Sequence, residues 1–314
     1  MKKKVLCATL TMVCMSWACQ SMAEELWDPQ PRGINIGLPA GALPPPGVYG
    51  VLDNYWASFD AYDHTGKVVP GTGLQALVEV PILLWVPGVQ VLGGDYALGI
   101  AQPFDYTSSG GISGHSGSGN WGLYNTLLIP AQVAWKMPND VFVKAGLIVG
   151  LDTASTTMPD LLSGRLTNGG LPSGNGYYSV QPTLGISWLH DGWNLSADLN
   201  YCIPVSKSTG HWMSGSVPVN YSYKSAPEFM ADYTVAKTVG KWTFGLGVHH
   251  QEQFTSDKLN GVTVPHSRAV NIGLGPLVEY QFAGLSILAE YNRDVHVKND
   301  VGGNFFNFRL VVPL

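Results

Sequence analysis

The sequence predicts an all-β chain that forms a single closed antiparallel transmembrane β-barrel of about twelve strands, with short periplasmic turns and longer outer loops. Apolar and polar residues alternate with period two, short and long connections alternate along the chain, and charged residues make up only 12%, against about 25% in soluble domains. No segment after the N-terminal stretch has the roughly 18 uninterrupted apolar residues of a spanning helix, and only helices and closed barrels satisfy every backbone group in lipid. A soluble secreted β-sandwich or jelly roll is the competing fold.

The first 23 residues are predicted to be a signal peptide. Lys2 to Lys4 precede a short apolar stretch, and Ser21-Met22-Ala23 is a small-x-small cleavage site before Glu24. The apolar stretch is too short to span a bilayer as a helix. We therefore expect export and cleavage near Ala23; a lipoprotein signal with Cys19 as the lipidated residue is an alternative that the residues before it fit poorly.

Charge and cysteine content narrow the possible partners. Removal of the signal peptide takes away three lysines and no acids, so the net charge moves from −5 to −8. No basic surface then remains to neutralise nucleic-acid phosphates. Of the 4 cysteines, only Cys202 follows the signal peptide, which excludes an intramolecular disulfide or a cysteine cluster for zinc. No cofactor is expected.

Residues 24–47 are predicted to be an extended N-terminal segment rather than a strand. The run Pro44-Pro45-Pro46 cannot donate hydrogen bonds to a sheet ladder. The sequence leaves open whether this segment lies in the periplasm or folds into the barrel mouth. The barrel is then expected over residues 48–314.

Each predicted strand has one apolar and one polar face, because successive side chains in a strand point to opposite sides. Two segments are less regular: Leu74 to Val86 is apolar on both faces, and the register of 89–106 slips near Gly93-Gly94. The predicted strands are 48–62, 71–85, 89–106, 121–136, 141–152, 177–189, 193–203, 228–239, 242–253, 267–282, 285–296 and 303–314.

The connections between these strands are alternately short and long, as in outer-membrane barrels with short periplasmic turns. An even number of strands also puts both ends of the barrel on the periplasmic side. The tight turns are 86–88, 137–140, 190–192, 240–241 and 283–284, and the long loops are 107–120, 153–176, 204–227 and 254–266, with shorter members at 64–70 and 297–302.

Aromatic residues near the tight turns predict a girdle at the periplasmic interface of the membrane. Enrichment of aromatics in strands would not by itself explain their common level. These residues are Trp85, Trp135, Trp188, Trp193, Trp242 and Phe282.

The last predicted strand alternates apolar residues up to the carboxyl terminus. It resembles the C-terminal recognition strand of outer-membrane proteins, although those usually end in Phe or Trp and this chain ends in Leu314. The resemblance implies that the outer-membrane assembly machinery is a partner and that the bilayer of the bacterial outer membrane is the destination.

The N-terminal third resembles the outer-membrane proteins of the "MetA-pathway of phenol degradation" family. The resemblance implies a barrel that admits small hydrophobic or aromatic compounds, and it carries over no catalytic residues. The residues that carry it are Leu43-Pro44-Pro45-Pro46-Gly47-Val48-Tyr49, Asn54-Tyr55, the Asp63-x-x-Gly66 turn, Leu92-Gly93-Gly94-Asp95-Tyr96-Ala97 and Gln102-Pro103-Phe104.

Charged residues on the polar faces are predicted to point into the lumen, since Lys or Arg facing lipid near the midplane costs about 2–4 kcal/mol. They could line an aqueous path or form a polar plug. The predicted residues are Lys144, Asp152, Asp198, Asp232, Glu279, Glu290 and Arg309. Apolar residues on the same faces could line a hydrophobic path or pack against the N-terminal segment; these are Tyr124, Phe142, Ile148, Leu189, Met230 and Leu277.

The residues favour a passive transporter over an enzyme. None of the 8 histidines stands beside a serine in a G-x-S-x-G setting, and His249 and His250 point to opposite faces of a strand, so they cannot chelate one metal. Together with what the family resemblance implies about the solute, this leads us to expect passive uptake of small hydrophobic or aromatic molecules. A narrow porin for hydrophilic solutes, a lipid-modifying enzyme and a structural surface barrel are the alternatives.

Overall fold

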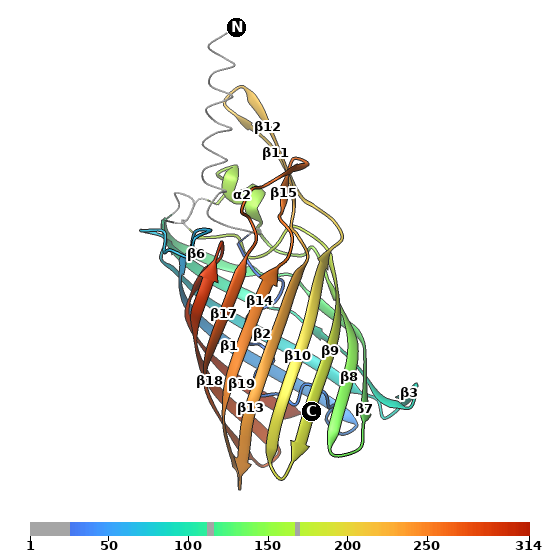
Figure 1. Cartoon of the computed structure of the whole chain (residues 1–314). Helices are drawn as coiled ribbons and strands as arrows, with labels where there is room; N and C mark the ends of the chain where they lie inside the picture. Colours follow the sequence, from blue (N-terminus) through green and yellow to red (C-terminus); the bar gives the residue numbers. More distant parts are fainter. Residues whose placement is uncertain (1–25, 112–115, 167–169) are drawn as a thin grey trace.

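The computed structural model describes residues 26–111, 116–166 and 170–314; the predicted signal peptide, 1–23, lies outside them. Within these ranges no helix is long and apolar enough to cross a membrane. Antiparallel strands form a single tall barrel (Figure 1). Its twelve wall strands are β1 (Gly47–Ala61), β2 (Leu74–Val86), β4 (Gly94–Ala101) continued by β5 (Phe104–Gly110), β6 (Ser116–Leu123) continued by β7 (Leu127–Lys136), β8 (Val141–Gly150), β9 (Ser179–His190), β10 (Trp193–Pro204), β13 (Glu228–Val239), β14 (Trp242–Gln253), β17 (Val270–Phe282), β18 (Leu285–Lys298) and β19 (Val301–Pro313).

The barrel closes between its first and last strands. β19 pairs with β1 over its whole length, from Pro313 opposite Tyr49 to Val301 opposite Ala61. The ring closes through the pairing of β2 with β4, so every strand of it is paired on both sides and no edge exposes backbone groups to lipid. The hairpin of β5 and β6 extends this ring, and β6 is paired with β5 alone. The predicted fold class, a closed antiparallel barrel of about twelve strands, is confirmed.

Period-two alternation separates a lumen face from an outer face. On β10, Trp193 and Leu195 are 41% and 38% exposed, whereas Asp198 and Cys202 are 7% and 0% exposed. The predicted girdle aromatics Trp85, Trp242 and Phe282 are exposed beside the tight turns, so the outer face carries aromatics at the periplasmic end.

The wall is interrupted between β4 and β5 and between β6 and β7. Pro103 has no N–H to donate, so the ladder breaks there, and side chains replace the missing bonds. The Gln102 amide donates to the carbonyls of Pro103 (3.0 Å) and Tyr124 (3.2 Å), and the Asn125 amide donates to the carbonyl of Leu151 (2.8 Å). Two segments predicted as continuous, 89–106 and 121–136, are therefore each broken.

The predicted register slip near Gly93 is a tight hairpin. β3 (Gln90–Val91) pairs with the start of β4, with Gln90 opposite Asp95. The tight turn expected at 86–88 is thus extended by a short additional strand at the periplasmic end.

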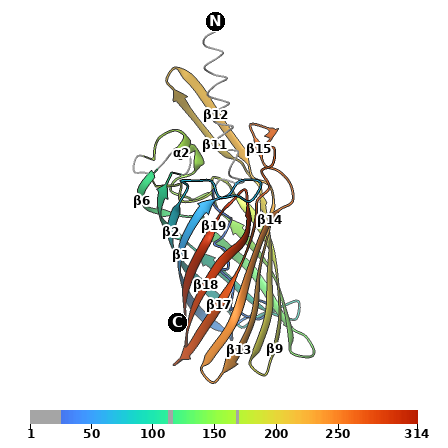
Figure 2. The ribbon, with the colours of Figure 1, turned by 60° about the vertical axis from the view of Figure 1, so that its left-hand side comes forward.

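The outer loops contain regular structure that the sequence did not predict. β11 (Ser208–Ser214), β12 (Val217–Lys224), β15 (Lys258–Leu259) and β16 (Val262–Thr263) form a separate four-stranded sheet. It stands above the barrel rim beside the short helix α2 (Met158–Leu162) (Figure 2). A buried apolar cluster that includes Met158, Leu161, Tyr221 and Tyr223 joins these loops to the barrel interior.

Candidate functional site: a plugged lumen

The N-terminal residues 26–41 lie inside the barrel, where Figure 1 shows the blue trace within the ring of strands. Near its start, the Trp27 indole N–H donates to the carbonyl of Pro172 in an outer loop (2.5 Å). Further on, the Gly41 N–H donates to the hydroxyl of Ser187, near the periplasmic end of β9 (2.7 Å). The segment therefore runs through the lumen from the outer loops to the periplasmic end, and we call it the plug.

Inward polar side chains of the wall satisfy the plug backbone. Buried backbone groups need hydrogen-bond partners, and a proline-rich segment cannot obtain them by joining a sheet. The plug N–H groups of Asn35, Gly37 and Ala40 donate to Asp232 (2.9 Å), Thr234 (2.9 Å) and Ser196 (3.3 Å), and the Asn194 amide donates to the Gly37 carbonyl (3.1 Å).

The plug touches the wall backbone closely on one side. A Cβ atom added at Gly185 of β9 would lie 1.9 Å from the carbonyl oxygen of Ala40, and one added at Gly41 would lie 2.2 Å from the carbonyl oxygen of Phe142. Only glycine allows backbones to approach this closely. The periplasmic half of the plug is therefore seated directly against β8 and β9.

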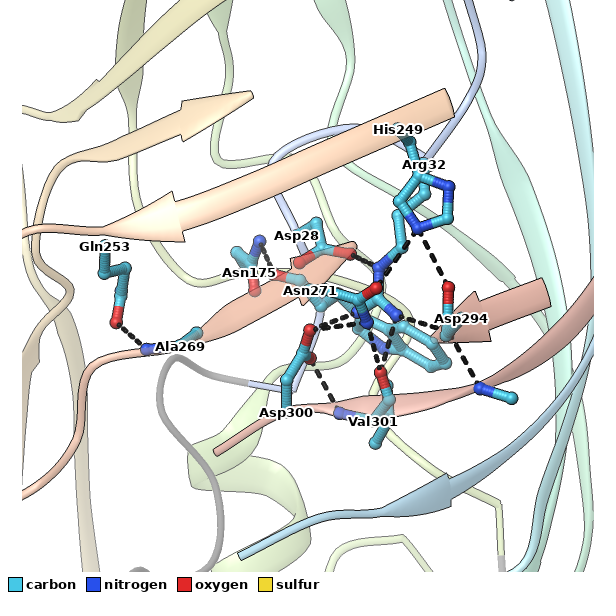
Figure 3. Close-up of polar contacts among 12 residues, drawn as sticks. Asp28, Arg32, Asn175, His249, Gln253, Ala269, Asn271, Asp294, Asp300 and Val301 are labelled. Carbon is cyan, nitrogen blue, oxygen red and sulfur yellow. Dashed lines mark hydrogen bonds and ion pairs between the residues drawn. The ribbon is translucent and has the colours of Figure 1, made fainter. Parts of the chain in front are cut away.

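Near the outer rim, the plug residue Arg32 is buried among three carboxylates (Figure 3). Its guanidinium nitrogens lie 2.6 Å from Asp28, 2.7 Å from Asp300 and 3.5 Å from Asp294, and Nη1 donates to the Val301 carbonyl (2.5 Å). Because a guanidinium keeps its charge in proteins, this cluster fixes the plug to the hairpin between β18 and β19.

Two further wall strands hold these carboxylates. His249 Nε2 of β14 lies 2.8 Å from an Asp294 carboxylate oxygen, and the Asn271 amide of β17 donates to Asp300 (3.2 Å). Figure 3 shows both side chains converging on the carboxylates around Arg32. Strands β14, β17 and β18 and the hairpin before β19 thus contribute to one anchor, which we call the rim anchor.

A second anchor lies deeper in the lumen, around Arg309 of β19. Arg309 Nε lies 2.8 Å from a carboxylate oxygen of Asp53 on the neighbouring strand β1, and the Asn307 amide donates to the same oxygen (2.8 Å). The Arg309 guanidinium also donates to two plug carbonyls, those of Ile36 (2.8 Å) and Ile34. A single buried cation therefore joins the closing seam of the barrel to the plug; we call this group the seam anchor.

Two cavities separate the plug from one side of the wall. The upper one has a volume of about 40 Å³ and lies between plug residues Trp27 and Pro31 and the inward aromatics Tyr55, Phe59 and Tyr124. The lower one, of about 90 Å³, is lined mainly by aliphatic side chains: Ile34, Val80, Ile82, Ala101, Leu127, Ile129 and Ile148, with Lys144, Asp198 and Asn200 at its polar side. Gln30 and Pro31 line both cavities, so the two follow one another along the plug.

A protein-family model for "Putative MetA-pathway of phenol degradation" matches residues 60–310. The chain belongs to this family. The family proposed from the N-terminal motifs is therefore confirmed.

Solved structures support the barrel fold of this MetA-pathway family protein. An outer membrane channel from Pseudomonas putida F1 has 16% identity and a TM-score of 0.71, covering 88% of this chain and 98% of that chain. The translocator domain of the autotransporter NalP from Neisseria meningitidis has 8% identity and a TM-score of 0.52, covering 87% of this chain and 91% of that one. No curated protein matches in sequence. At these identities the likeness concerns the fold alone.

Most of the residues predicted to line the lumen of this MetA-pathway family protein do face inward, but many of them contact the plug. Asp232 binds the plug backbone and Arg309 binds plug carbonyls. The buried inward residues are Asp198, Asp232, Glu290, Arg309, Tyr124 and Met230, and the half-buried ones are Lys144, Glu279 and Phe142.

Asp152 is placed differently from the prediction. β8 ends at Gly150, where the Leu151 N–H donates to the Thr126 carbonyl (2.9 Å) and the Thr153 N–H donates to the Leu151 carbonyl (3.0 Å). This tight turn takes Asp152 out of the strand into an outer loop, where it is exposed. It therefore does not line the lumen.

Of the residues that form the two anchors, only Arg309 was predicted to line the lumen; Arg32, Asp300 and Asp53 show why the others were missed. Arg32 is a single cation in the proline-rich segment, and that isolated charge was a usable signal. Asp300 stands in a short hairpin turn that resembles any polar turn. Asp53 lies on an inward face of β1 that is otherwise apolar, with Tyr55, Ala57 and Phe59 buried, so alternation alone did not mark it as polar.

Among residues 26–111, 116–166 and 170–314, no group of three or more His, Cys, Asp or Glu side chains could hold a metal ion. His249 Nε2 lies 2.8 Å from an Asp294 carboxylate oxygen and 3.1 Å from the Asn271 side-chain oxygen, so this imidazole is part of the rim anchor. The described lumen is thus filled by the plug and the side chains that hold it.

Proposed function

We propose that this protein is an outer-membrane channel for passive uptake of small hydrophobic or aromatic molecules. The observation that carries the proposal is the pair of consecutive cavities between the plug and β1, β2, β4 and β7, lined mostly by aliphatic and aromatic side chains. Small-molecule sites are typically apolar with a few polar groups. This also gives a reason for the apolar lumen face of β2, where Leu74, Ala76, Val78 and Val80 are buried.

Passage requires the plug to move. Cavities of about 40 and 90 Å³ are smaller than the roughly 150 Å³ cavity that binds benzene in an engineered protein core. A ring-sized solute therefore needs the side chains of the plug to give way locally, while the rim and seam anchors hold the segment in the lumen.

Whole-cell uptake tests the proposal. Cells with and without the protein receive trace labelled toluene or phenol and, in parallel, a labelled hydrophilic sugar. Faster initial entry of the aromatic alone is the expected result. No change in either solute would contradict a channel and would favour a structural surface barrel or an enzyme.

A narrow porin for small hydrophilic solutes is the second candidate. It is favoured by the inward polar residues, because the lumen would be wet and lined by acids if the plug left. Faster entry of the sugar as well as the aromatic would support it. In a planar bilayer under a salt gradient, an open lumen of this kind is expected to prefer cations mildly, and anion selectivity would contradict that expectation.

Removal of the plug tests whether it limits passage. Deletion of residues 26–43 is expected to raise single-channel conductance several-fold, because the backbone that fills the lumen is lost. It should also lower resistance to urea, because wall side chains such as Asp232 and Arg309 lose their partners. Unchanged conductance would mean that the plug does not limit passage.

Membrane assembly is proposed to depend on β19. Its outward face is apolar to the last residue, with Phe306 and Leu314 43% and 74% exposed, as expected for a strand that the outer-membrane assembly machinery recognises. Truncation of the last two residues should reduce the heat-modifiable, folded fraction in the outer membrane. A folded fraction equal to that of the intact chain would contradict the proposed recognition.

A further inference from the structure

Four cations gather on the outer rim of an otherwise acidic protein. Lys67 lies in the turn after β1, Arg268 just before β17, and Arg293 and Lys298 on the outward face of β18. The first three are exposed and Lys298 is half-buried. His296, also exposed, lies between the last two. We call these residues the rim cluster.

Contacts between neighbouring elements hold the rim cluster together. Val270 at the start of β17 is paired with Lys298, and the Asn299 amide donates to the Arg268 carbonyl (2.9 Å). A Cβ atom added at Gly66 would lie 3.6 Å from Cγ of Lys298, so the turn that carries Lys67 packs against the end of β18. The cations therefore lie on adjoining elements rather than at scattered loop tips.

A polar hollow of about 160 Å³ lies within the rim cluster. Tyr62 and Thr65 line it from the turn after β1, and His296 and Lys298 line it from β18. Asp294 also belongs to the lining, but its carboxylate lies 3.5 Å from Arg32 and 2.8 Å from His249 on the lumen side. It has room for a group such as a phosphate, since one water takes a share of about 30 Å³ in the liquid. Hydroxyl, imidazole and ammonium groups can all donate hydrogen bonds to phosphate oxygens.

The nearby acids are largely engaged elsewhere. Asp63 accepts from the N–H groups of Thr65 (2.8 Å) and Lys67 (3.0 Å) and so stabilises its own turn. Asp294 and Asp300 point inward to Arg32. Two acids remain, Asp60 on β1 and Glu252 on β14, which is paired with Val270 and lies 3.3 Å from His250. Among the described residues no ion pair of 4.0 Å or less joins either of them, or any other acid, to a rim-cluster cation. The rim cluster therefore keeps an excess of positive charge.

The rim cluster lies just above an apolar band on the outer face of the barrel. Directly below it on the outer face are Tyr291, Phe306 and Trp56, which are 45%, 43% and 66% exposed and are adjacent across β18, β19 and β1. This apolar band is the surface expected in the outer hydrocarbon layer. The cations begin two residues further along β18, at the level of lipid head groups.

We propose that the rim cluster binds the phosphate groups of lipopolysaccharide, the anionic lipid of the outer leaflet. Basic pockets at the membrane surface recognise anionic head groups through charge and hydrogen bonds, and guanidinium is well suited to phosphate oxygens. Because the predicted mature chain has a net charge of −8, general attraction of a basic protein to an anionic surface does not account for such binding.

A binding titration with lipid A tests the proposal on the full-length protein in neutral detergent. The variant K67Q/R268Q/R293Q/K298Q removes the cations of the rim cluster. The matched control K136Q/K224Q/K241Q/K258Q removes the same number of positive charges, all of them exposed, from the periplasmic end and the outer sheet. Heat-modifiability on gels checks that both variants are folded.

The rim-cluster variant is expected to bind bis-phosphorylated lipid A at least about tenfold more weakly. This follows if each exposed ion pair contributes roughly a twofold change in affinity. The control is expected to bind lipid A as tightly as the unaltered protein. Lipid A without phosphates should bind with no difference among the three proteins. Equal weakening in both variants would overturn the proposal, because binding would then follow net charge alone. Saturation by inorganic phosphate at the same concentrations would also overturn the proposal, because the site would then bind free anions rather than the lipid. Absence of lipid A binding to the unaltered protein would overturn it as well.

Discussion

Replacement of Arg309 by methionine should loosen the plug and the barrel seam together. Arg309 is 1% exposed and Asp53 0%, so the variant leaves a buried carboxylate supported only by the Asn307 amide. Loss of one partner of a buried ion pair costs about 3–5 kcal/mol. The two bonds to the plug carbonyls are lost as well, and hydrogen bonds to charged groups contribute about 1.5–3 kcal/mol each.

Because these contributions are not additive, we expect two effects of R309M. The free energy of unfolding should fall by about 3–5 kcal/mol, and the plug should be anchored more weakly. Urea unfolding in phospholipid vesicles, followed by tryptophan fluorescence, measures the first effect. Single-channel conductance measures the second, and it should rise because the plug loses two contacts in the middle of the lumen.

The double variant D53N/R309M separates the two effects. Asparagine removes the unpaired charge at the seam, so most of the lost stability should return, while the bonds to the carbonyls of Ile34 and Ile36 remain absent and conductance stays high. The reasoning would be refuted if R309M matched the unaltered protein in both measurements, or if D53N restored conductance as fully as stability.

Other perturbations act on single features. The variant G185A places a methyl group against the Ala40 carbonyl, where an added Cβ lies 1.9 Å away. We expect its free energy of unfolding to fall by about 1–3 kcal/mol and its conductance to rise. The control G73A, whose added Cβ has a carboxylate oxygen 3.9 Å away as its nearest neighbour, should leave conductance unchanged. The backbone N–H of Lys67 and the contacts from Thr65 hold the pKa of Asp63 down to about 2. Because the pKa is lowered on folding, the stabilisation of this turn is present above the ordinary pKa near 4 and is lost as pH falls through about 2. Amide resonances of Thr65 and Lys67 should therefore shift between pH 4 and pH 2, and should not do so in D63N.

Much of the barrel could be predicted because side-chain alternation and tight turns are patterns between residues close in sequence. The alternation along β10 and β14 fixed which residues face inward, and the short turns fixed the order of the strands. The exceptions have physical causes: Pro103 breaks a predicted strand, and the turn after Gly150 places Asp152 outside the lumen. The outer sheet of β11, β12, β15 and β16 arises from pairing between loops distant in sequence, which no local pattern reveals.

The plug could not be placed from sequence, because its bonds join irregular backbone to side chains on strands far along the chain. The contact from the Asn35 N–H to Asp232 leaves no periodicity in either segment. One sign was present: the inward positions Ala76, Val78, Val80 and Ile82 of β2 are all apolar, which is unusual for a strand beside a polar lumen. The structure explains it, since these residues line the cavities beside the plug.

The course of the plug constrains the order in which this protein reaches its final form. The segment from Trp27 to Gly41 fills the lumen and is bonded to β9, β10, β13, β18 and β19. To thread it through a finished cylinder would mean drawing two charged side chains, Asp28 and Arg32, past the seam anchor. If the strands instead curl around the segment before β1 meets β19, each polar group finds its partner as the wall advances. The lumen would then be built around its contents, and the last strand to pair would be the one that locks them in.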